Sequence, residues 1–181
     1  METVLPLPTL QISTATYNLT GMAKVLRVFF LLLRLLAVAA TLCAVVIMAT
    51  SHDSTTVFGI TLEAKFQHTP ALVFFVVANG IAFIYSLIVL FVPSTSLLSR
   101  SIIVFDVILA MLLTAAIAAA GAMAQLGKKG NSHAGWFPIC DRVPNFCDHV
   151  MGAMICGCVA VITFLLIVLY DIHQVLSPKF P

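Results

Sequence analysis

The sequence predicts an all-α membrane protein, a four-transmembrane-helix bundle with both the N and C termini in the cytoplasm. Of the 181 residues, 61% are hydrophobic and 9% are charged, whereas a soluble domain is about 45–50% apolar and about 25% charged. A soluble fold of this length cannot bury so much apolar side chain. Four segments reach the length of about 20 apolar residues that a helix needs to cross a bilayer.

The predicted membrane domain, residues 25–171, is flanked by two cytoplasmic tails, 1–24 and 172–181. The first tail lacks the apolar core of a signal peptide and carries Pro6 and Pro8, so it is expected to be disordered. The spans and the two long outer loops are placed as follows: spans at 25–50, 70–92, 101–124 and 150–171, and loops at 51–69 and 125–149.

The orientation depends on two cysteines, because Lys and Arg are equally frequent on the two sides of the predicted membrane domain. Cys140 and Cys147 lie in the second outer loop with six residues between them, and two turn-forming prolines, Pro138 and Pro144, lie just before Cys140 and between the cysteines. We expect them to form a disulfide, with free thiols as the alternative. Disulfides persist on the oxidising side of a membrane, which places both long loops outside the cell. No four-ligand set accompanies them, so a metal site is not expected.

Two charged residues lie inside predicted spans, Arg34 in the first and Asp106 in the third. Each costs roughly 2.5–3.5 kcal/mol at the middle of a bilayer. Arg34 lies seven residues beyond Arg27, and Asp106 lies six beyond Arg100. At a rise of 1.5 Å per residue, both are about 9–10 Å inside the cytoplasmic end, so we predict an intramembrane ion pair. We interpret the pair as a structural latch; the alternative is a relay in a small transporter or channel.

Each span also carries small residues, which let helices approach closely in lipid. Every fourth residue of the third span, starting from Asp106, is small and is predicted to face the bundle. The residues predicted to pack between helices are Ala37, Thr41, Ala78, Ala82, Ala110, Thr114, Ala118 and Gly152. Most of the large side chains are expected to face lipid or a second copy of the chain; they are Phe29, Phe30, Leu31, Phe74, Phe75, Phe164 and Leu165.

Nothing in the sequence supports catalysis. It contains no nucleophile–base set, phosphate-binding loop or paired carboxylates, so we expect neither an enzyme nor a cofactor. The net charge of +2 is too small and too scattered to indicate a nucleic-acid partner.

Four features, taken together, resemble the Casparian strip membrane domain protein-like (CASP-like) family of plants, which is related to the MARVEL four-span proteins. They are Arg34, Asp106, the segment AKFQHTPALVFFVVANGIA at 64–82, and the loop WFPICDRVPNFC at 136–147. The first outer loop, SHDSTTVFGITLEAKFQHT, lacks the extended signature of the founding members, which indicates the broader CASP-like group.

This resemblance implies a non-enzymatic scaffold of the plasma membrane. Its expected partners are membrane lipid, a second copy in a homodimer or higher homo-oligomer, related family members in hetero-oligomers, and cell-wall-modifying enzymes. The aromatic residues Trp136, Phe137 and Phe146 of the second outer loop are candidates for contact with such partners.

Overall fold

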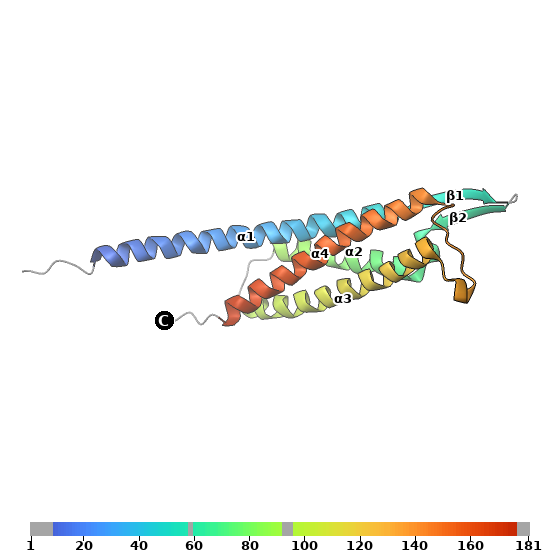
Figure 1. Ribbon diagram of the computed structural model, residues 1–181. Helices are drawn as coiled ribbons and strands as arrows, with labels where there is room; N and C mark the ends of the chain where they lie inside the picture. Colours follow the sequence, from blue (N-terminus) through green and yellow to red (C-terminus); the bar gives the residue numbers. More distant parts are fainter. Residues whose placement is uncertain (1–8, 58–59, 92–95, 177–181) are drawn as a thin grey trace, which may run out of the picture.

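The computed structural model describes residues 9–57, 60–91 and 96–176 and contains a bundle of four long helices (Figure 1). The helices are α1 (Thr9–Ala49), α2 (Pro70–Phe91), α3 (Ser96–Lys129) and α4 (Pro144–Leu176). Each contains a stretch long and apolar enough to cross a membrane: Lys24–Ala49, Pro70–Phe91, Arg100–Lys129 and Pro144–Leu176. The predicted four-helix membrane bundle is therefore confirmed.

The helices form a ring in chain order. α1 packs against α2 and α4, and α3 packs against the same two helices. Consequently α1 and α3 lie on one diagonal of the bundle, and α2 and α4 lie on the other. The start of α1 and the end of α4 point toward the same end of the bundle (Figure 1).

The N-terminal segment differs from the prediction of a disordered tail. α1 begins at Thr9, and the part of the chain before it lies outside the described residues. No proline interrupts the sequence between Thr9 and the first span. Extending an existing helix needs no new nucleus, so polar residues attached to a stable span can continue it.

The first long loop contains a two-stranded hairpin, which the sequence analysis missed. Strands β1 (His52–Val57) and β2 (Ile60–Lys65) pair antiparallel, with His52 opposite Lys65 and Val57 opposite Ile60. Both strands are rich in β-branched residues, and the two residues between them include Gly59. This pattern is a recognised hairpin signal. The hairpin projects beyond the end of the bundle opposite to the start of α1 (Figure 1).

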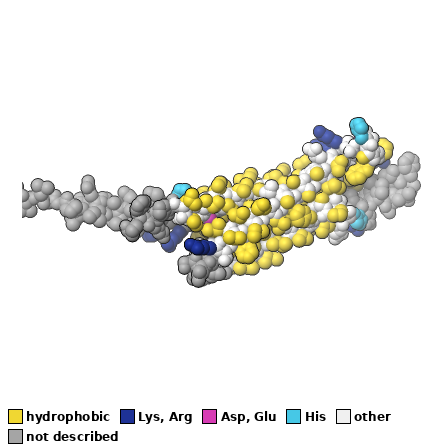
Figure 2. All heavy atoms as spheres, turned by 90° about the horizontal axis from the view of Figure 1, so that it is seen from below, with side chains coloured by type: hydrophobic (Ala, Val, Ile, Leu, Met, Phe, Trp, Pro, Cys, Tyr) yellow, Lys and Arg dark blue, Asp and Glu magenta, His cyan; other side chains and the backbone are white. Residues whose placement is uncertain are grey.

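The sides of the bundle are apolar. Figure 2 shows hydrophobic side chains along its length and Lys, Arg and His gathered toward its two ends. Large exposed side chains such as Leu32, Met111 and Ile162 lie on three different helices. A continuous apolar surface of this kind is stable in lipid and not in water, in agreement with four spans.

The centre of the bundle is filled by large side chains set against small ones. The prediction that the large residues mostly face outward was wrong for Phe75 and Phe164, which are fully buried. It holds for four others, which are exposed: Phe29, Leu31, Phe74 and Leu165. Gly157 of α4 makes room for Phe75 of α2, because a Cβ at Gly157 would lie 2.8 Å from the Phe75 ring. Because Gly157 of α4 has no side chain, the Phe75 ring of the diagonally opposite helix α2 can reach across the centre of the bundle.

Candidate functional site: a buried charge cluster

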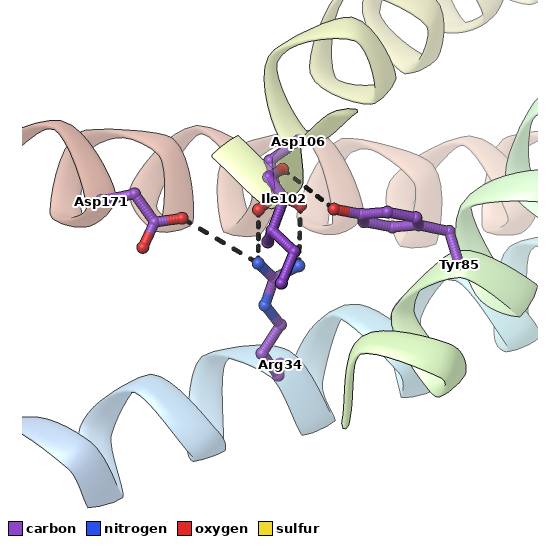
Figure 3. A network of polar contacts seen from close by, with 5 residues as sticks. All are labelled: Arg34, Tyr85, Ile102, Asp106 and Asp171. Carbon is purple, nitrogen blue, oxygen red and sulfur yellow. Dashed lines mark hydrogen bonds and ion pairs between the residues drawn. The ribbon is translucent and has the colours of Figure 1, made fainter. Parts of the chain in front are cut away.

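The most unusual feature of the membrane domain is a buried ion pair between Arg34 and Asp106 (Figure 3). Arg34 Nη1 donates to Asp106 Oδ1 at 2.7 Å, and Arg34 Nη2 donates to Oδ2. The two side chains are 1% and 0% exposed. The bidentate geometry matches the planar guanidinium to the carboxylate, which is the arrangement best suited to a buried pair. Because α1 and α3 are diagonal, the pair crosses the centre of the bundle.

Each of the four helices contributes a side chain to this cluster (Figure 3). Tyr85 of α2 donates its hydroxyl to the backbone carbonyl of Ile102 in α3, at 3.0 Å. Asp171 of α4 places Oδ2 4.0 Å from Arg34 Nη2. The cluster therefore connects all four helices at one level of the bundle.

Aromatic rings surround the charges. The Phe30 ring centroid lies 5.1 Å from Arg34 Cζ, a distance at which the π face attracts a cation. Phe30 in turn lies against Tyr170, with ring centroids 5.3 Å apart. These rings cover the cluster where α1 and α4 meet.

Asp171 is the member of the cluster that the sequence analysis missed. The predicted fourth span ends at this residue, but α4 continues to Leu176 and so brings Asp171 inside the helix. Its Oδ2 is buried and has no hydrogen-bond partner within the described residues. The cluster thus combines one guanidinium with two carboxylates. Its position in the sequence could have identified it, because Asp171 ends the fourth predicted span and so lies near the same end of the bundle as Arg34.

The structure separates the predicted packing residues into two groups. Ala37, Thr41, Ala78, Ala82 and Ala110 are buried between helices, whereas Thr114 and Ala118 are exposed. The prediction for these last two was wrong because four residues turn a helix by about 400°, so an every-fourth pattern drifts about 40° per step around it.

The buried face of α3 instead alternates steps of three and four. It includes Asp106, Ala110, Leu113, Ala116 and Ala120.

The glycine that permits close packing in α4 is also not the predicted one. Gly152 is half-buried, and the nearest atom to a Cβ there is Ile47 Cγ2 at 3.8 Å. Gly157 is fully enclosed and contacts the Phe75 ring. Gly157 lies about two turns inside the fourth predicted span, a depth at which a glycine indicates close helix packing.

The second long loop is closed by a disulfide between Cys140 and Cys147, whose Cα atoms are 5.7 Å apart. Its backbone is hydrogen-bonded to itself and to α3: Asn131 and Trp136 exchange two bonds, and the Gly127 carbonyl accepts from the N–H of Cys140. Gly130 has φ +64°, and a Cβ there would lie 2.5 Å from the Trp136 carbonyl oxygen. The loop therefore has a defined conformation.

The three aromatic candidates of this loop do not share one environment. Trp136 and Phe137 are 56% and 86% exposed. Phe146 belongs to the first turn of α4 and is buried in the core, so it is not available to a partner. In the described part of the chain, no cluster of three or more His, Cys, Asp or Glu residues is placed to hold a metal ion.

These features define a four-span membrane protein with a charge cluster inside the bundle and a disulfide-closed loop at one end. Residues 23–163 match the family model described as the Casparian strip membrane protein domain. The chain belongs to this family.

Its curated relatives are plant proteins of similar length. The chain is 49% identical to CASP-like protein 1C2 of Ricinus communis, over 85% of this chain and 94% of the relative. It is 50% identical to CASP-like protein 1C1 of Sorghum bicolor, over 87% and 97%, and 46% identical to CASP-like protein 1C1 of Arabidopsis thaliana, over 84% and 93%. No solved structure matches the chain.

Proposed function

We propose that this protein is a non-enzymatic scaffold of the plasma membrane that self-associates into membrane subdomains and organises cell-wall-modifying partners. Membership of the Casparian strip membrane protein family supports this proposal. The described part of the chain is mostly membrane domain, with the first turns of α1, a hairpin and one closed loop beyond it. A chain of this build acts through lateral contacts in the membrane and through its short loops.

The observation that carries the proposal is a row of small side chains on the outside of α3. Thr114, Ala118 and Ala122 are spaced by four residues and are all exposed, with Ala115 beside them. In lipid, small residues at this spacing let a second helix approach closely enough for backbone contact. The single chain leaves this row uncovered, so a second copy or a related chain is its expected partner.

The orientation is part of the proposal. The disulfide at Cys140–Cys147 favours an oxidising compartment for the loop that contains it. The hairpin lies at the same end of the bundle as this loop, and both termini then lie in the cytoplasm (Figure 1). Trp136 and Phe137 would face the cell wall and supply exposed aromatic surface for its proteins.

The test compares two identical changes on exposed helical alanines. Ala118→Leu places bulk in the middle of the row on α3, whereas Ala39→Leu places it on an exposed position of α1. We expect Ala118→Leu to reduce co-isolation of two differently tagged copies by about tenfold, equivalent to about 1.4 kcal/mol. It should also speed photobleaching recovery of a fluorescent fusion in the plasma membrane.

Ala39→Leu should behave as the wild type in both measurements. Wild-type protein that diffuses as freely as a monomer, or an Ala118→Leu variant that still co-isolates normally, would contradict self-association through α3.

A second candidate function is a small transporter or channel that uses the Arg34–Asp106 pair. The buried Oδ2 of Asp171, which has no hydrogen-bond partner within the described residues, supports it, because an extra carboxylate beside an intramembrane ion pair is typical of an ion or proton path. Flux through reconstituted vesicles that Asp106→Asn abolishes, with co-isolation of tagged copies intact, would favour transport over the scaffold.

A further inference from the structure

A cavity of about 550 Å³ lies between α3, α4 and the disulfide-closed loop, at the end of the bundle remote from the charge cluster. Its walls are mostly apolar and aromatic, and include Leu72, Met123, Trp136, Phe137 and Val150. The volume is within the range of about 300–1,000 Å³ that binding sites for small molecules occupy. Neither the ion pair nor the exposed row on α3 contributes to it.

The mouth of this cavity lies where a membrane surface is expected. The cavity is lined by Thr69 and Leu72 at the start of α2, and the 22 residues of α2 cover about 33 Å at 1.5 Å per residue. This length is close to the hydrocarbon thickness of a bilayer, about 30 Å. Lys128 and Trp136 are also residue types that mark the boundary between hydrocarbon and water. The cavity therefore opens at the level of lipid head groups.

The hollow continues from this mouth toward the middle of the membrane. A second cavity of about 470 Å³ shares Ala124, Lys128 and Met151 with the first. It extends along α3 to Gly121, about 10 Å deeper than Lys128, and is bounded on α4 by Met154. The lining of this second cavity is apolar apart from Gln125, Lys128 and Lys129, and an open hollow of this kind along a helix can hold an acyl chain.

The charges at the mouth select the head group. Lys128 of α3 and Asp148 of α4 both line the first cavity and are both exposed. Among the described residues, Lys128 forms no ion pair with Asp148. A purely anionic head group would be repelled by Asp148, and a purely cationic one by Lys128 and by Lys129, which lines the second cavity. A head group that carries both charges complements the two residues together.

We propose that these two cavities bind one zwitterionic phospholipid of the surrounding leaflet. Its phosphate lies toward Lys128 and its ammonium group toward Asp148, while an acyl chain runs along α3 past Ala124. Ala122 of the exposed row on α3 also lines the second cavity, so the lipid lies beside the proposed contact with a second copy of the chain. The site does not depend on which leaflet surrounds it.

Trp136 is the only tryptophan of the chain, so its fluorescence reports this site directly. The full chain in detergent micelles is titrated with phosphatidylcholine whose acyl chains carry bromine, which quenches tryptophan on contact. We expect quenching that saturates, with a midpoint at least about fivefold lower than for brominated phosphatidylglycerol. Ala124→Phe fills the hollow and should raise the midpoint at least about tenfold, whereas Ala39→Phe, which lines neither cavity, should not change it.

Two exposed variants test the head group and do not disturb the core, so they decide the question even where Ala124→Phe fails to fold. Asp148→Asn should remove the preference for phosphatidylcholine, and Lys128→Gln should weaken binding of both lipids. Quenching that rises without saturation and is unaffected by Ala124→Phe and Lys128→Gln would overturn the site. Equal binding of the two lipids by the wild type would overturn the zwitterionic assignment.

Discussion

Arg34 meets Asp106 across the diagonal of the bundle, between two helices that otherwise make little direct contact. Neighbouring helices are already held by side-chain packing, whereas α1 and α3 depend on long side chains that reach over the centre. Both partners are buried, so each would be an uncompensated charge without the other. We therefore interpret the pair as a latch that fixes the register of the parallel helices α1 and α3.

Asp171 is expected to contribute much less than Asp106 to this latch. Asp106 accepts two hydrogen bonds from Arg34, whereas the Asp171 carboxylate only approaches it, at 4.0 Å. Asp106→Asn should lower the free energy of unfolding by about 3 kcal/mol or more, because it leaves the guanidinium without its counter-charge. Asp171→Asn should change it by less than about 1 kcal/mol. Denaturant titration in mixed micelles, followed by circular dichroism, measures both; equal losses would mean that the carboxylates share Arg34 equally.

Gly157 is expected to tolerate no side chain. A Cβ at this position would lie 2.8 Å from Cε2 of the Phe75 ring, and Phe75 is itself fully buried, so the ring has little room to move. Gly157→Ala should cost about 1–3 kcal/mol through overpacking. Gly152→Ala serves as the matched control, since its Cβ would make only an ordinary contact with Ile47. The same unfolding titration compares them, and a Gly157→Ala variant as stable as Gly152→Ala would show that α2 and α4 are not so closely packed.

The disulfide is expected to stabilise the second outer loop and leave the bundle unchanged. Cys140 and Cys147 are seven positions apart, and closing so short a loop contributes about 2–3 kcal/mol in the chain-entropy account. Changing both to Ser should lower the thermal midpoint reported by Trp136 fluorescence without changing the helical signal in circular dichroism. Cys156→Ser, which removes a free thiol inside α4, should leave the Trp136 midpoint as it is. A double variant with an unchanged Trp136 transition would contradict this role.

The parts of the fold that depend on local pattern could be predicted from the sequence. Long apolar runs indicate the helices, and equal depth on parallel spans is sufficient to predict that Arg34 and Asp106 meet. The diagonal placement of their helices could not be predicted, because depth fixes the level of a residue and not its position around the ring.

The errors have three separate causes. Thr114 and Ala118 were assigned to the wrong face because an every-fourth pattern drifts around the helix. Phe75 was assigned to lipid because its partner, Gly157, lies on a different helix and is visible only in three dimensions. Asp171 was overlooked because helix ends are the least certain feature of a span, and α4 extends beyond it to Leu176.

If Arg34 and Asp106 form a latch, each charge is needed mainly to compensate the other. A double-mutant cycle tests this most directly. The free energy of unfolding is measured for Arg34→Leu, Asp106→Leu and the double variant, together with the yield of each at the plasma membrane. Each single change should cost about 3–5 kcal/mol, because it leaves one buried charge unpaired. The double apolar variant should recover most of that loss and reach the membrane as the wild type does. A double variant no more stable than the single ones would contradict the latch.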